Sequence, residues 1–71
     1  MATTAYTIQI LQEMAVEAWS DEGQMLKACY EDIGESAESA RQTWEDSYEA
    51  GGEDVDWQAV ADYFKALAES L

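Results

Sequence analysis

The side chains able to do chemistry in this chain are almost all carboxylates. Its 71 residues include 16 Asp and Glu against three Lys and Arg, with one Cys and no His. Without His, catalytic triads and dyads that use an imidazole base cannot form, and most zinc sites lose a usual ligand. No glycine-rich phosphate loop is present. We therefore expect a protein that is not an enzyme and that uses neither a metal nor another cofactor.

Two arrangements of carboxylates come closest to known sites. A calcium loop beginning at Asp54 would place Asp54 and Asp56 at its first and third positions. However, Ala59 stands where such a loop needs Gly, and Lys65 stands where it needs a bidentate Glu. Paired carboxylates could also act as acid and base, but they need a cleft that gives the two groups different environments. A chain of this size offers little cleft.

A short motif resembles part of another protein family. Asp46-Ser47 is similar to the Asp-Ser-Leu motif of acyl carrier proteins, small acidic helical chains whose Ser carries phosphopantetheine. Tyr48 replaces the Leu, and Ser47 is expected late in a helix, whereas the family's Ser opens one. The resemblance covers two residues and implies an acidic carrier protein as a minor alternative.

The acids concentrate between residues 31 and 56, where ten acids accompany one base, Arg41. Carboxylates four residues apart on a helix are about 6 Å apart, a spacing similar in scale to that of the phosphates along duplex DNA. Such rows could accept the Arg and Lys hydrogen bonds that a basic groove normally gives to phosphates.

This acidic region predicts a nucleic-acid mimic that inhibits a basic, nucleic-acid-handling protein. In size, charge and helicity the chain resembles phage-encoded inhibitors of restriction and CRISPR systems. The net charge of −13 argues against direct binding of nucleic acid or an anionic membrane. The expected partner contacts are Glu31, Asp32, Glu35, Glu38, Glu45, Asp46, Glu49, Glu53 and Asp54.

Two other interpretations fit the same composition. The chain could be a general helical protein–protein interaction module or a homodimer, with Trp44, Tyr48 and Tyr63 as exposed aromatic contacts. The acids could also form an ordinary solvated face or reflect a halophilic proteome. Loss of partner binding after neutralisation of the acids would favour mimicry over either interpretation.

The length predicts one domain over residues 1–71. Cys29 cannot form an internal disulfide, and its place in an apolar stripe predicts a small buried side chain. The first residues show no signal-peptide pattern, and no segment is long and apolar enough to cross a membrane. We expect a cytoplasmic protein.

The apolar pattern predicts an all-α fold, a small up-and-down bundle of three to four helices. The clearest helix is the last, which Asp56 caps and which runs to Leu71. It supplies most of the large apolar side chains that the other segments must cover.

The segments before the last helix are also predicted to be helical. The first helix should run from a cap at Thr3 or Thr4 to about Ser20, with Val16 on its polar side. The second should run from Asp21 to about Ile33, followed by Gly34 as a left-handed C-cap. The third should run from a cap at Ser36 to about Ala50. The sequence leaves open whether the second and third are separate.

Overall fold

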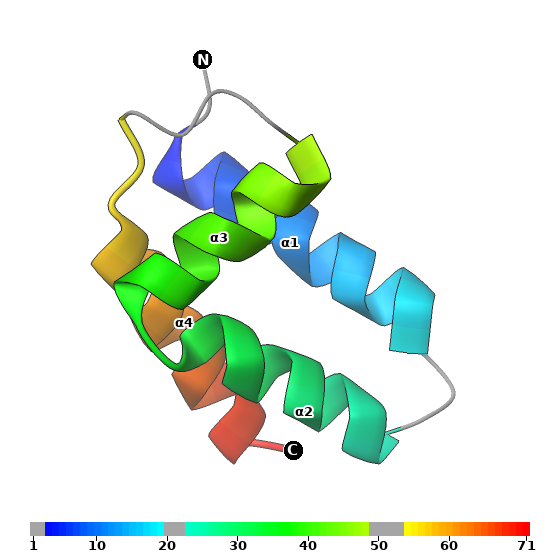
Figure 1. Ribbon diagram of the computed structural model, residues 1–71. Coiled ribbons are helices and arrows are strands. Elements are labelled where there is room, and N and C mark those ends of the chain that lie inside the picture. The colour runs from blue at the N-terminus through cyan, green and yellow to red at the C-terminus, as the bar shows by residue number, and fades with distance from the viewer. Residues whose placement is uncertain (1–2, 20–22, 49–53) are drawn as a thin grey trace.

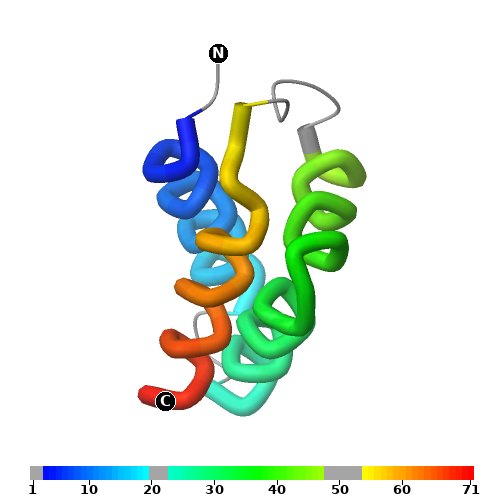
Figure 2. The backbone as a smooth tube through the Cα atoms, turned by 90° about the vertical axis from the view of Figure 1, so that its left-hand side faces the viewer, coloured from blue at the N-terminus to red at the C-terminus, as the bar shows by residue number. Residues whose placement is uncertain are grey.

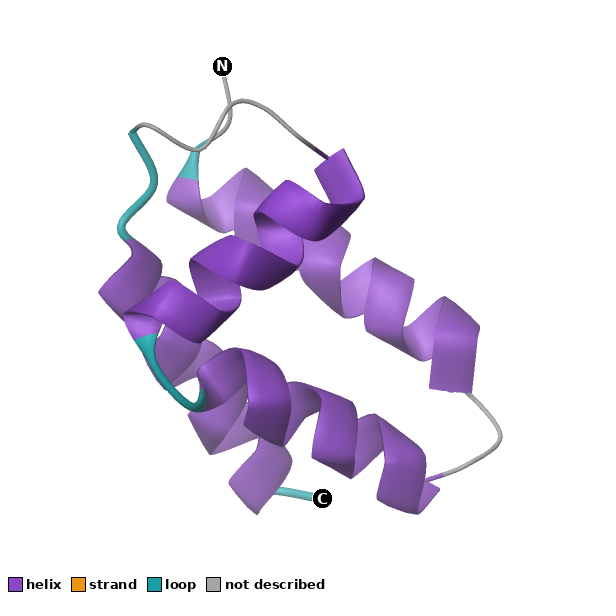
Figure 3. Cartoon of the chain, viewed as in Figure 1, coloured by secondary structure: helices purple, strands orange, loops and turns teal. Residues whose placement is uncertain are grey.

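Four helices make up the described part of the chain. The computed structural model describes residues 3–19, 23–48 and 54–71, and these contain no strand (Figure 3). The helices are α1 (Thr4–Trp19), α2 (Gly23–Gly34), α3 (Ala37–Tyr48) and α4 (Trp57–Glu69) (Figure 1). The predicted all-α fold is confirmed, and the second and third helices are separate. The predicted start at Asp21 and end at Ala50 lie outside the described residues.

The helices form a small bundle, but consecutive helices do not all run in opposite directions. In Figure 2, α1 and α4 run downwards, whereas α2 and α3 follow one another upwards. A corner at Glu35 and Ser36 joins these two rising helices. The most extensive helix–helix contact is between α2 and α4, and α3 packs on both. None of the described helices has the length and apolar character needed to cross a membrane.

The core forms around α4, as its apolar pattern predicted. Phe64 and Val60 are completely buried and face apolar side chains from the other three helices. Leu11 of α1 and Ile33 of α2 are also buried, with 0% and 1% of their surface exposed. The buried apolar residues in the described part of the chain are Leu11, Ala15, Tyr30, Ile33, Ala40, Trp44, Val55, Val60, Ala61, Phe64 and Ala68.

Polar side chains cap the N-termini of three helices, as predicted from the sequence. The caps are Thr3, Ser36 and Asp56, whose side-chain oxygens each accept the backbone N–H three residues later over 3.0–3.2 Å. Each contact satisfies a donor that the first helical turn leaves unpaired. In addition, the Oγ1 of Thr4 accepts the backbone N–H of Asp56 over 3.0 Å, which fastens the start of α1 to the start of α4.

Gly34 does not have the predicted role. It is the last residue of α2, and its φ lies outside the left-handed range, so the expected left-handed C-cap is wrong. A Cβ at this position would lie 2.5 Å from the backbone N of Lys65 and 3.1 Å from the carbonyl O of Ala61. Gly34 is therefore required because the backbones of α2 and α4 approach one another closely here.

Thr7 is a polar residue inside the core. Its side chain on α1 is completely buried, and its hydroxyl has no hydrogen-bond partner among the described residues. Its polar residue type argues against a core position, although Thr7 lies four residues before the buried Leu11 on the same face of α1. An unpaired buried hydroxyl lowers the stability of a fold.

Candidate binding surface

Every acidic side chain that the structure describes is exposed. None of these carboxylates is buried in the core, so all are open to a partner. Seven of the nine predicted contact residues are in this set, and Glu49 and Glu53 lie outside the described residues. The exposed acids are Glu13, Glu17, Glu31, Asp32, Glu35, Glu38, Glu45, Asp46, Asp54, Asp56, Asp62 and Glu69.

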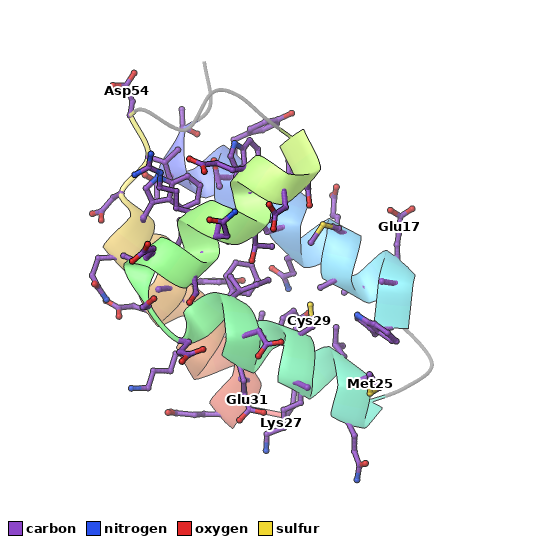
Figure 4. All side chains as sticks on the ribbon, in the orientation of Figure 1. Glu17, Met25, Lys27, Cys29, Glu31 and Asp54 are labelled. Carbon is purple, nitrogen blue, oxygen red and sulfur yellow. The ribbon has the colours of Figure 1, made fainter. Side chains whose placement is uncertain are left out.

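The predicted contacts extend along the molecule instead of forming one compact patch. The Cα atoms span 31 Å in the longest direction, which corresponds to about nine base-pair steps of duplex DNA. Glu31 and Asp54 lie towards opposite ends of the molecule (Figure 4). Between them, α3 carries Glu38 and Glu45, which are two turns or about 10 Å apart along the helix axis.

One base, Arg41, partly offsets the negative charge of this stretch of α3. The Nε of Arg41 lies 2.8 Å from the Oε1 of Glu45, and this is the one ion pair among the described residues. Both side chains are largely exposed, so the pair adds little to stability. It does hold the Glu45 carboxylate in one position and cancels part of its charge.

Glutamines hold other carboxylates without cancelling their charge. The amide of Gln42 donates to Asp46 over 2.9 Å, and that of Gln58 donates to Asp62 over 3.0 Å. Gln and the acid are four residues apart in each pair, the spacing at which side chains meet on a helix. These pairs were not among the predicted site features, although the spacing alone could have revealed them. The carboxylates of Asp46 and Asp62 are consequently ordered, and neither forms an ion pair with a described base.

The two lysines lie away from α3. They line a groove of about 600 Å³ between α2 and α4, and neither forms an ion pair with a described residue. Because this groove mixes both signs of charge, its negative potential is partly offset. Its lining residues are Lys27, Glu31, Asp32, Gly34, Glu35, Lys65, Ala68 and Glu69.

The predicted aromatic contacts have different positions. Trp44 is 5% exposed and packs against Trp57 with 6.4 Å between ring centroids, so its prediction as an exposed contact is wrong. The reason is that the narrow apolar stripe of α3 packs on α4. Tyr63 is 39% exposed, so it is accessible to a partner as predicted. The side chain of Tyr48 lies outside the described residues.

The half-buried thiol of Cys29 is a weak candidate for reaction. Burial, followed by the negative charge of Asp32, raises the pKa of Cys29 and favours the protonated thiol. Burial also raises the pKa of Tyr30, with smaller effects from Cys29 and Tyr63. Among the described residues, no group of three or more potential ligands is placed to hold a metal ion.

Ser47 is exposed in the last turns of α3, as expected from the sequence. Its hydroxyl points to the Sδ of Met14 on α1 at 3.4 Å. The resemblance to a carrier motif therefore concerns a serine at the end of a helix that already contacts a neighbouring helix.

No protein-family model matches the chain, and comparison with curated proteins and with solved structures also found no match.

Proposed function

We propose that the protein is a non-enzymatic acidic binding protein that mimics nucleic acid. It occupies the basic groove of a nucleic-acid-handling protein and excludes that protein's normal ligand. The main support is the exposure of every described carboxylate, of which Glu45 alone is paired with a base. Such a surface repels itself, and a cationic partner would relieve this repulsion.

The α3 surface is the centre of the proposed contact. Glu38 and Asp46 form no ion pair with a described base, and their helix is fastened to the core through Ala40 and Trp44. A guanidinium of the partner could form charge-assisted hydrogen bonds with these carboxylates, as it would with phosphates. Because the interaction is electrostatic, we expect fast association that weakens as the salt concentration rises. Partners of this kind would place its action in the cytoplasm.

Affinity capture from a nuclease-treated bacterial lysate tests this proposal. The baits are the wild-type chain, an α3 variant with Glu38→Gln and Asp46→Asn, and an α4 control with Asp62→Asn and Glu69→Gln. The two variants change the net charge equally, and each neutralises one glutamine-bonded aspartate. A duplex DNA oligonucleotide serves as competitor.

Mimicry predicts a nucleic-acid-binding protein that DNA displaces from the wild-type bait. The α3 variant should bind it more weakly by about tenfold or more, because two charge-assisted contacts are lost. The α4 control should retain it. Equal loss from both variants would show that the total charge, and not the α3 surface, determines binding. A partner that both variants retain and DNA does not displace would contradict mimicry.

A helical interaction module is the second candidate. The observation in its favour is the exposed ring of Tyr63, a side chain type common at the centres of protein interfaces. Substitution of Tyr63 with Ser should then remove the partner while the α3 variant keeps it. Sedimentation at two protein concentrations tests the homodimer form of this candidate.

A further inference from the structure

The outward side of α1 carries apolar side chains among polar ones. Of the five large hydrophobic side chains that are exposed in the described part of the chain, Tyr6 and Val16 are on α1 and Tyr63 is next to it on α4. Tyr6 and Val16 are 51% and 40% exposed. They are ten residues apart, or about 15 Å along the helix axis. We call this surface, formed by Tyr6, Val16, Tyr63 and the carboxylates of Glu13 and Glu17, the α1 face.

A shallow depression runs along the α1 face. Its volume is about 530 Å³, and it is lined by Gln9, Gln12, Glu13, Val16 and Glu17. Tyr6 belongs to the same side of the helix, because it precedes Gln9 by three residues and Glu13 by seven. The lining residues extend over about two turns of α1, from Gln9 to Glu17, which is about 12 Å along the helix axis.

Tyr63 is held rigidly beside this depression. Its hydroxyl donates to the Oε1 of Gln12 over 2.9 Å, and its ring packs edge-on against Phe64 with 5.4 Å between centroids. A tyrosine that is already fixed loses little conformational freedom when a partner covers it. The exposed part of its ring is thus a preorganised contact at the border of the α1 face.

The charges on the α1 face have one sign. Its ionisable side chains at the depression are the carboxylates of Glu13 and Glu17, and Gln9 holds Glu13 in place over 3.4 Å. The three bases are elsewhere, with Arg41 on α3 and both lysines at the groove between α2 and α4. A complementary occupant is therefore basic, whereas a second copy of this chain would bring like charges together.

We infer that the α1 face binds a short amphipathic basic helix of a protein partner. Apolar side chains of that helix would cover Val16 and the rings of Tyr6 and Tyr63, and its Lys or Arg residues would pair with Glu13 and Glu17. In Figure 2, α1 and α3 are on opposite sides of the upper part of the molecule. The inference does not depend on nucleic-acid mimicry, which concerns the α3 surface.

Two synthetic peptides of identical Leu and Lys composition test the inference. One has Leu at three- and four-residue steps so that it forms an apolar stripe, and the other distributes the same residues around the helix. Each peptide is titrated into ¹⁵N-labelled protein at two salt concentrations. The proteins are the wild-type chain, Val16→Thr, and the control Met25→Thr, which alters an exposed apolar residue on α2.

The striped peptide should bind about tenfold more tightly than the redistributed one, because it alone buries apolar surface on the α1 face. Amide shifts should concentrate at Tyr6, Val16 and Tyr63. Val16→Thr should weaken the striped peptide about fivefold, and Met25→Thr should leave its affinity unchanged.

Equal affinity of the two peptides, absence of binding by the striped peptide, or equal effects of the two substitutions would overturn the inference. So would a concentration-dependent dimer that Val16→Thr dissociates, since a second copy would then be the occupant. None of these results bears on whether DNA displaces a captured partner from the α3 surface, so the two proposals can fail separately.

Discussion

Substitution of Gly34 with Ala should push α2 away from α4. The added Cβ would lie 2.5 Å from the backbone N of Lys65 and 2.9 Å from its Cα. Because these are backbone atoms, no change of rotamer can relieve the clash. The helices must move apart, and they share the most extensive contact in the bundle.

Two opposing free-energy contributions determine how much Gly34→Ala changes the stability of the fold. Overpacking of a close contact costs about 1–3 kcal/mol, and a clash with rigid backbone belongs in the upper part of that range. Ala is favoured over Gly in a helix by at most about 1 kcal/mol, and by less at the last residue. We therefore expect Gly34→Ala to lower the free energy of unfolding by about 1–2 kcal/mol. For a domain of this size, that is a decrease in Tm of about 5–15 °C.

Gly23→Ala supplies the matched control, because a Cβ at Gly23 would meet nothing within 4 Å. Urea unfolding followed by circular dichroism should show Gly23→Ala to be as stable as the wild type or slightly more stable. A Gly34→Ala variant that is stabilised to the same degree as Gly23→Ala would refute the close approach of α2 and α4.

Substitutions at three further positions test other parts of the fold. Thr7→Val should raise the free energy of unfolding by about 1 kcal/mol in urea denaturation, because it removes an unpaired buried hydroxyl at nearly constant volume; a loss of stability would indicate a hidden hydrogen bond. Asp56→Ala should lower Tm through a loss of about 1 kcal/mol, whereas Asp56→Asn should retain most of the cap. Burial raises the pKa of Tyr30 above its ordinary value of 10.0, so the folded state holds this proton more tightly than the unfolded state. The resulting stabilisation is complete below pH 10 and is lost as the pH rises above it. Urea unfolding at a series of pH values should therefore show that the free energy of unfolding falls less at alkaline pH in Tyr30→Phe than in the wild type.

Local sequence signals predicted the features that depend on neighbouring residues. The caps at Ser36 and Asp56 were predicted correctly, because a capping side chain reaches only three residues along the chain. The apolar stripe of α4 was also clear, since burial of Val60 and Phe64 follows from a helical period. Exposure of the acids followed from their residue type, because charged groups are costly to bury without a partner.

The features that were predicted wrongly depend on how helices meet. Gly34 looked like a C-cap because the crossing of α2 and α4 cannot be read from one segment. Trp44 was proposed as an exposed contact only under the interaction-module interpretation, and the burial of its ring depends on the packing of α3 against α4. Likewise, the hydrogen bond between Tyr63 and Gln12 joins residues 51 positions apart.

The position of α4 in the core has a consequence for biosynthesis. It is the last of the four helices to leave the ribosome, yet Leu11, Ile33 and Trp44 all need it as their cover. Until α4 emerges, a nascent chain exposes these apolar side chains and cannot complete its core. Exposed apolar surface promotes aggregation of unfinished chains. The dense negative charge of the earlier segments would keep such chains apart during this interval, because like-charged chains repel one another.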